Sequence, residues 1–138
     1  MNQLVTRRTA RMAANVATIA FGVGIVLQLL LAAGILPVTM AWGGSQPVLT
    51  TALRLSSLLA VVILGLAAYV IRRRAGLIGT GPVSLPIKVL AWVITAYMAL
   101  NALGNFASAS AAEKLVFGPI ALILFGACLL VSISRTDQ

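Results

Sequence analysis

The chain alternates four long apolar stretches with short segments that hold most of its charged residues. The first stretch, Met12 to Leu36, has roughly 25 residues, and at about 1.5 Å per residue a helix of that length crosses a ~30 Å hydrocarbon core with some tilt. The second stretch lies between Arg54 and Arg72 and is slightly short, so its helix is expected to begin nearer Val48. The pattern predicts helices over residues 12–36, 48–71, 87–106 and 115–134.

Two prolines fit these boundaries. The third stretch opens just after Pro86, a residue that is tolerated at a helix start, and Pro119 falls in the first turns of the fourth, where a missing N–H costs little. Short connections between consecutive spans make neighbouring helices antiparallel. The sequence therefore predicts an all-α integral membrane protein, with residues 1–138 forming a single antiparallel bundle of four transmembrane helices.

The basic residues are unevenly placed between the two ends of these spans. Arg54 and Lys114 stand at one end, and the other eight stand at the opposite end. A surplus of Lys and Arg near the spans marks the cytoplasmic side. Both termini and the connection between the second and third helices are therefore expected in the cytoplasm, with the chain in the inner membrane of a cell. The eight residues are Arg7, Arg8, Arg11, Arg72, Arg73, Arg74, Lys88 and Arg135.

Composition supports a membrane protein and excludes several other classes. The chain is 61% hydrophobic and 9% charged, with a mean hydropathy of +1.08, which no ordinary soluble domain shows. The net charge of +8 could indicate nucleic-acid binding, but the basic residues flank apolar spans instead of forming a basic face, so no nucleic-acid partner is expected. The first apolar stretch is also too long for the core of a signal peptide, and a retained first helix is expected.

Few residues of the chain could support catalysis or metal binding. There is one cysteine, Cys128, no histidine, and only two carboxylates, Glu113 and Asp137. Neither a His/Cys metal cluster nor a carboxylate pair for acid–base chemistry can be built from this set. We therefore expect no metal, no cofactor and no enzymatic activity.

Polar residues inside the spans gather toward the end opposite the basic cluster. Such residues are costly in a membrane and are candidates for a functional site. Tyr97, Asn101 and Asn105 share one face of their helix because they are four residues apart, and Trp42 could fold over them as a lid. These side chains predict a polar ligand-binding pocket, with Arg54 as its electrostatic centre, able to hold a carboxylate or phosphate. The candidate residues are Gln28, Trp42, Arg54, Ser57, Tyr97, Asn101, Asn105 and Glu113.

A purely structural interpretation of the same residues stays open. Arg54 could extend to the membrane interface or pair with Glu113. The amide side chains could tie helices together through hydrogen bonds of around 1 kcal/mol, and Trp42 could belong to the aromatic belt at the membrane surface.

Two further patterns indicate packing and topology. Ala14, Thr18 and Gly22 recur every four residues, a spacing that permits close approach of another helix. The triple arginine 72–74 is interpreted as a topology determinant that attracts anionic lipids by about 1 kcal/mol per residue. The glycines at 76, 79 and 81 lack the strand and the Lys-Ser/Thr pair of a phosphate loop.

Short motifs resemble those of small membrane-protein families. The segment Leu100 to Phe106 is similar to the Asn-x-x-Gly-x-Phe helix of small fluoride channels, but there the motif lies on an earlier helix. Small multidrug-resistance transporters share the four spans but use a glutamate in the first helix, where this chain has Gln28. The chain more closely resembles a family of uncharacterised small bacterial four-span inner-membrane proteins. Its matching positions are Ala41 to Gly44, Arg54, Asn101 to Ser110, and Glu113.

That last resemblance implies no activity, so two functional hypotheses remain. The first is a non-enzymatic protein that binds a lipid, a small amphiphile or a partner helix through the polar pocket. The second is an oligomeric channel or transporter that uses the same residues. The expected partners are membrane lipids, a second copy of the chain or another membrane protein.

Overall fold

The computed structural model describes residues 5–135, and these residues contain helices and turns but no strand. The four long helices are α1 (Arg7–Ala33), α2 (Thr51–Arg74), α3 (Leu85–Ala107) and α4 (Gly118–Ile133). Two short 3₁₀ turns, η1 (Val38–Met40) and η2 (Trp42–Gly44), follow α1, and a π-helical turn, η3 (Glu113–Phe117), precedes α4. With η3 counted as part of α4, each helix is long and apolar enough to cross a membrane. The all-helical, four-helix prediction is confirmed.

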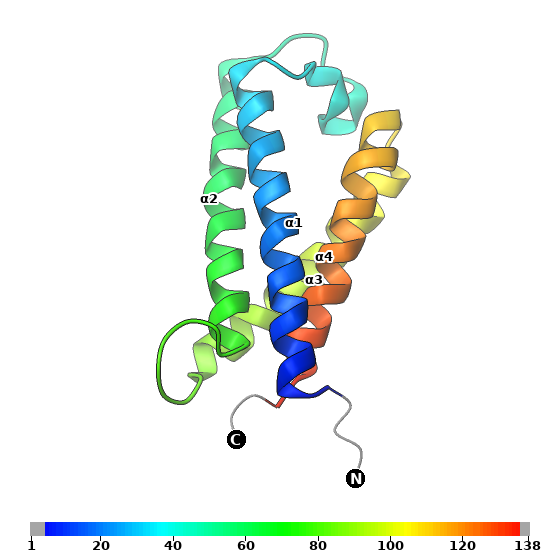
Figure 1. Ribbon diagram of the computed structural model, residues 1–138. Coiled ribbons are helices and arrows are strands. Elements are labelled where there is room, and N and C mark those ends of the chain that lie inside the picture. Colours follow the sequence, from blue (N-terminus) through cyan, green and yellow to red (C-terminus); the bar gives the residue numbers. More distant parts are fainter. Residues whose placement is uncertain (1–4, 136–138) are drawn as a thin grey trace.

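The helices form an antiparallel bundle in which α1 pairs with α2, and α3 pairs with α4 (Figure 1). The described ends of the chain and the connection between α2 and α3 lie at one end of the bundle. We call it the basic end, because it carries the eight clustered basic residues named above, seven arginines and one lysine. The opposite end, formed by residues 34–50 and 108–113, is called the distal end. Helices α1 and α4 approach each other near the basic end and diverge toward the distal end, where η1 and η2 lie between them.

Helix α1 begins and ends earlier than predicted, at Arg7 and Ala33 instead of 12 and 36. At its start, the side chain of Thr6 accepts a hydrogen bond from the Thr9 N–H at 3.2 Å, so the polar residues before the apolar run still form helix. At its end, Gly34 adopts φ 77°, and its N–H bonds to the carbonyls of the last turn. A left-handed glycine ends a helix at low cost, which is why the apolar residues at 35 and 36 lie outside α1.

Helix α2 is shifted the other way, to Thr51–Arg74 instead of 48–71. Thr50 caps its start by accepting from the Leu53 N–H at 3.2 Å. The three consecutive arginines, 72–74, form the last turn of the helix, where positive charge interacts favourably with the helix dipole. The polarity of arginine favours a loop, but arginine is also a good helix former.

The start of α4 is irregular for a reason visible in the sequence. Pro119 has no N–H to donate, and just before it the chain forms the π-helical turn η3, in which the Gly118 N–H bonds to the Glu113 carbonyl five residues earlier. Glycine at 118 allows a tight contact with α3, since a Cβ there would lie 2.9 Å from the Phe106 ring. The fourth predicted helix, 115–134, is thus divided into a π turn and a regular α-helix.

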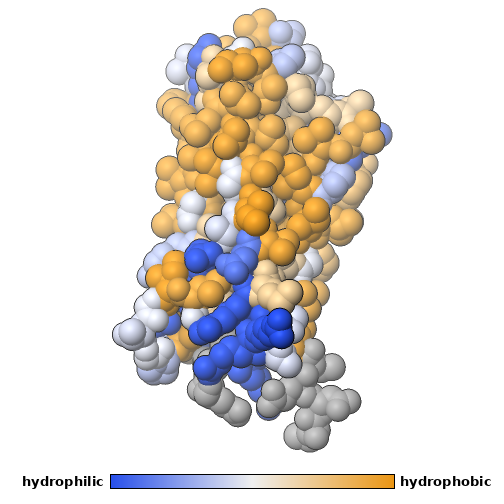
Figure 2. All heavy atoms as spheres, viewed as in Figure 1, coloured by the Kyte–Doolittle hydropathy of each residue, from blue (hydrophilic) through white to orange (hydrophobic). Residues whose placement is uncertain are grey.

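The interior is narrow and rich in small residues. Helix α1 buries five alanines together with Phe21 and Leu31. Of the predicted stripe of Ala14, Thr18 and Gly22, only Ala14 is buried, and Gly22 faces open space. Large apolar side chains are exposed on all four helices, and Figure 2 shows them covering the face above the hydrophilic basic end. The buried alanines of α1 are at positions 10, 13, 14, 17 and 20.

Candidate functional site

The connection between α1 and α2 folds across the distal end and packs on the connection between α3 and η3. The Ser110 hydroxyl donates to the carbonyls of Thr39 and Met40 at 3.2 and 3.4 Å. Gly44 permits this contact, because a Cβ at that position would lie 3.2 Å from the Ser110 Cβ. Two loops far apart in the sequence therefore close one end of the bundle together.

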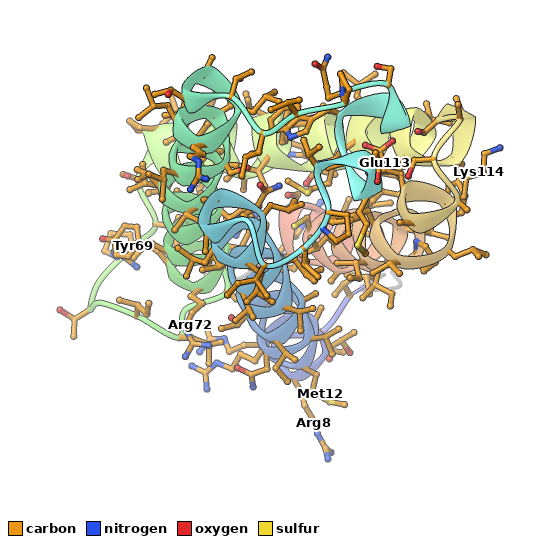
Figure 3. All side chains as sticks on the ribbon, turned by 90° about the horizontal axis from the view of Figure 1, so that it is seen from above. Arg8, Met12, Tyr69, Arg72, Glu113 and Lys114 are labelled. Atoms are coloured by element: carbon orange, nitrogen blue, oxygen red, sulfur yellow. The ribbon has the colours of Figure 1, made fainter. Side chains whose placement is uncertain are left out.

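Glu113 holds the same two loops together through its carboxylate. The Gly43 N–H lies 3.2 Å from each carboxylate oxygen, and the Ser108 hydroxyl donates to Oε2. Figure 3 shows Glu113 turned toward η1 and η2, whereas the neighbouring Lys114 points away from the bundle. Hydrogen bonds to a carboxylate are stronger than those between neutral groups, so Glu113 fixes the position of the loop.

The backbone at the tip of this loop is left-handed over three consecutive residues. Trp42, Gly43 and Gly44 have φ values of 58°, 73° and 72°. Positive φ costs a glycine nothing, but for a tryptophan it is uncommon and strained by about 1–3 kcal/mol, a conformation that persists where surrounding contacts impose it. The turn places Trp42 beside α1, α2 and α3, where it lines a cavity described below.

A polar cavity of about 520 Å³ opens on α3 next to Glu113. Two of its lining residues, Asn101 and Asn105, are joined by hydrogen bonds, since the Asn105 Nδ2 donates to the Asn101 Oδ1 and carbonyl at 2.5 and 2.9 Å. This confirms that the two asparagines share a helical face. The cavity is lined by Gly43, Tyr97, Leu100, Asn101, Gly104, Asn105, Ala107, Ser108 and Glu113.

A second cavity of about 270 Å³ adjoins the first, because both are lined by Tyr97 and Asn101. It reaches between α1 and α2, where Gln28 lines it. The Oε1 atom of Gln28 is buried and has no hydrogen-bond partner within residues 5–135. A buried acceptor without a partner is uncommon in proteins, which marks Gln28 as a candidate for a functional role. The lining residues are Gln28, Trp42, Ser56, Leu59, Ala60, Ile63, Leu64, Tyr97 and Asn101.

Arg54 and Ser57 line neither of these two cavities. The Arg54 side chain is turned toward α1, where its Nη1 donates to the Ala32 carbonyl at 2.9 Å. Helix α1 ends there without basic residues of its own, so Arg54 supplies both a donor and a positive charge to that helix terminus. Ser57 is fully buried on α2, and its hydroxyl has no partner within the described residues. The structure thus brings together six of the eight predicted residues and separates Arg54 from Glu113.

An apolar groove of about 600 Å³ continues from the polar cavities toward the basic end, between α2 and α3. Tyr97 belongs to all three surfaces, and Ile63 belongs to the groove and the second cavity. The result is one continuous surface, polar at the distal end and apolar below, which we call the α2–α3 groove. Its apolar part is lined by Ile63, Leu66, Ala67, Tyr69, Val70, Ile87, Leu90, Val93, Ile94, Tyr97 and Met98.

Sequence reasoning missed three serines of the site. Ser56 lines the second cavity, Ser108 binds Glu113, and Ser110 joins the two loops. The spacing Ser110-x-x-Glu113 is a local signal for a serine at a helix start, and the Glu113 N–H does donate to the Ser110 hydroxyl at 3.4 Å. The bonds from Ser110 to the Thr39 and Met40 carbonyls have no local signal, because those partners lie about 70 residues earlier in the chain.

The charge of the site is set by one carboxylate. Glu113 is the only acidic residue within residues 5–135, because Asp137 lies outside the described part of the chain. No lysine or arginine lines either polar cavity. The polar part of the α2–α3 groove therefore combines one carboxylate with amide and hydroxyl groups that both donate and accept, and without a lining cation it suits a positively charged or hydrogen-bond-donating ligand.

Comparison of the chain with protein-family models, with curated proteins and with solved structures gave no match.

Proposed function

We propose that this protein is a non-enzymatic membrane protein that binds an amphiphile in the α2–α3 groove, with a hydrogen-bond-donating head at the distal end and an apolar chain below it. The observation that carries the proposal is the buried, unpartnered Oε1 of Gln28 beside a cavity also lined by Asn101. An ammonium or hydroxyl group of a ligand would donate to the Glu113 carboxylate, and a turn of the Gln28 side chain, whose Oε1 is closed to solvent, would let the ligand donate there as well. A purely anionic head is disfavoured because it would meet that carboxylate without a lining cation.

The apolar part of the groove supports the assignment of a chain-bearing ligand. From Tyr97 to Ile87 it follows α3 for ten residues, roughly 15 Å at about 1.5 Å per residue. That length is about half of a ~30 Å hydrocarbon core. If the polar head of the ligand lies at Asn101, its apolar tail would cover Leu66, Leu90 and Val93, which are exposed on the two helices.

The proposed setting is a cellular inner membrane, with all four helices inserted and both termini in the cytoplasm. The apolar exterior of the bundle and the gathering of eight basic residues at one end support this orientation. The polar part of the α2–α3 groove would then lie in the outer half of the bilayer. A second copy of the chain, or another membrane protein, is the partner we propose for the exposed helical faces.

An oligomeric channel or transporter is the second candidate. The polar cavities would form its outer entrance. Against it, bulky apolar side chains such as Phe21, Met98 and Leu124 fill the buried cluster inside the bundle. A conducting path would have to run between copies of the chain.

Retention of two lipids that differ only in the head tests the binding proposal. The purified chain is incubated with equal amounts of a phosphatidylethanolamine and a phosphatidylcholine of identical acyl chains, and the retained lipid is measured by native mass spectrometry. Only the ethanolamine head carries N–H donors. We expect roughly threefold to tenfold preference for it, the value of about one net hydrogen bond. Equal retention of the two lipids would contradict the proposal.

Substitutions test which residues cause the preference for the ethanolamine lipid. Gln28→Leu and Asn101→Leu should abolish it, and Gln28→Leu should raise the melting temperature of the lipid-free protein, since it removes a buried acceptor without a partner. Gln46→Leu, in the same loop as Trp42 but outside both cavities, is the matched control and should change neither quantity. Arg54→Gln should lower stability through loss of the bond to Ala32 while leaving the lipid preference intact.

A further inference from the structure

A separate cavity of about 250 Å³ lies at the basic end of the bundle, the opposite end from Glu113. Arginines from two helices line it, Arg7 and Arg11 from the first turns of α1 and Arg73 from the last turn of α2. The connection between α2 and α3 completes the wall with the glycines at 76, 79 and 81. Figure 2 shows the hydrophilic surface gathered at this end of the molecule.

Hydrogen bonds to backbone carbonyls hold two of these guanidinium groups in place. Arg11 Nη2 donates to the Gly76 carbonyl at 3.1 Å, and Arg73 Nη2 donates to the carbonyls of Thr80 and Pro82 at 3.4 and 3.3 Å. A guanidinium has five N–H donors, so each keeps further donors for a ligand. The loop thus positions the arginines and does not neutralise them.

The glycines allow the loop to wrap around Arg73. All three have left-handed backbones, with φ values of 69°, 75° and 80°. At Gly79 the approach is close, since a Cβ there would lie 3.0 Å from the Arg73 Nε. The glycine spacing therefore serves a function that the local sequence does not reveal, namely packing backbone against a guanidinium supplied by the helix before it.

The three consecutive arginines have distinct roles. Arg72 donates to the side chains of Asn15 and Thr18 on α1, and Arg74 is buried against the end of α4. Of the three, only Arg73 lines the cavity. Membrane topology requires positive charge at this end but does not require that three guanidinium groups from two helices converge on one cavity.

We infer that this cavity binds a phosphate group. Arginine forks match the geometry of phosphate oxygens, and the only acidic residue within 5–135 lies at the other end of the bundle. The volume accommodates a phosphate group with a few waters, since one water occupies about 30 Å³. The phosphate can come from an anionic phospholipid head, which lies at this level if the helices span a bilayer, or from a soluble phosphate compound.

The test compares arginines that line the cavity with neighbours that do not. Binding of phosphatidylglycerol is followed by native mass spectrometry, and binding of inorganic phosphate and pyrophosphate by ³¹P NMR titration, both on the full chain in a non-ionic detergent. Arg73→Gln and Arg7→Gln should each weaken binding roughly tenfold, as expected for loss of one charge-assisted hydrogen bond. Arg8→Gln and Arg72→Gln remove the same charge outside the cavity and should change binding less than twofold.

The outcomes separate the sources of the phosphate. Tight binding of phosphatidylglycerol alone assigns the site to a lipid head, and competition by pyrophosphate assigns it to a soluble ligand as well. The inference would be overturned if neither phosphatidylglycerol nor the soluble phosphates bind. It would also be overturned if all four substitutions weaken binding equally, because the attraction would then be a general effect of net charge. Arg7→Gln keeps the test valid if Arg73→Gln does not fold, since the Arg7 side chain makes no hydrogen bond to another residue within 5–135.

Discussion

The guanidinium of Arg74 donates a hydrogen bond to the carbonyl of Ser134, with 2.6 Å between Nη2 and the oxygen. A second, longer bond of 3.4 Å reaches the Ser132 carbonyl. Arg74 ends α2, the Ser132 carbonyl lies in the last turn of α4 and Ser134 follows that helix as its C-cap, so the contact joins the ends of two helices that run in the same direction. Only 6% of Arg74 is exposed, which makes it a packing residue as well as a charge.

Arg74→Met should therefore destabilise the protein by about 1–3 kcal/mol, the cost of leaving buried acceptors without their partner. Arg8→Met is the matched control, because Arg8 is exposed and points away from the bundle (Figure 3). Its effect should stay within about 0.5 kcal/mol. Unfolding in detergent, followed by circular dichroism, measures both. Equal loss in the two variants would show that Arg74 contributes only charge.

Glu113→Ala should release the loop that carries Trp42. Removing the carboxylate takes away the acceptor of the Gly43 N–H and of the Ser108 hydroxyl, and charge-assisted bonds of this kind contribute about 1.5–3 kcal/mol each. Amide hydrogen exchange over residues 41–46 should accelerate at least tenfold. Lys114→Ala, one residue away and facing outward, should leave the exchange rate unchanged. Unaltered exchange in Glu113→Ala would argue that Ser110 alone anchors the loop.

Gly118→Ala and Gly126→Ala form a matched pair on α4. An added Cβ at 118 would lie 2.9 Å from the Phe106 ring, whereas none of the surrounding atoms lies within 4 Å of one at 126. The first substitution should cost about 1–3 kcal/mol through overpacking. The second should be neutral or stabilising by up to ~1 kcal/mol, because alanine is the better helix former. Adding Phe106→Leu to Gly118→Ala should restore part of the lost stability, a coupling that thermal unfolding of the double variant measures.

Orientation is tested by labelling single cysteines in intact cells. Cys128 is buried and is replaced by alanine to give a background without thiols. Ser45→Cys in the distal loop should react with a membrane-impermeant maleimide, and Thr80→Cys at the basic end should react only after the membrane is broken. Both side chains are exposed, so a reversed pattern would refute the positive-inside assignment of the termini.

How much of the candidate site the sequence predicts depends on how far apart in the chain the interacting residues lie. Asn101 and Asn105 were placed correctly on one face because helical spacing is local, and their mutual hydrogen bond confirms it. Arg54 lies at the end of the bundle that its position in the span predicts, but it lines neither polar cavity. Its partner, the Ala32 carbonyl, exists only because Gly34 ends α1 early and leaves that carbonyl free of a helical bond. The depth of a residue follows from its position in a span, whereas the direction of its side chain depends on the neighbouring helices.

The sequence by itself determined the number of helices, their alternating direction and the separation of a basic end from a polar one. These follow from span length, apolar composition and the cost of burying charge, which are properties of each segment alone. Only the tertiary structure decided which polar residues meet. The contacts of Glu113 with Gly43, of Arg73 with the loop around Gly79, and of Arg74 with Ser134 depend on short-range hydrogen bonds and steric fit between separate segments. Such contacts are set by the packing of the whole bundle, and no single apolar stretch contains the information for them.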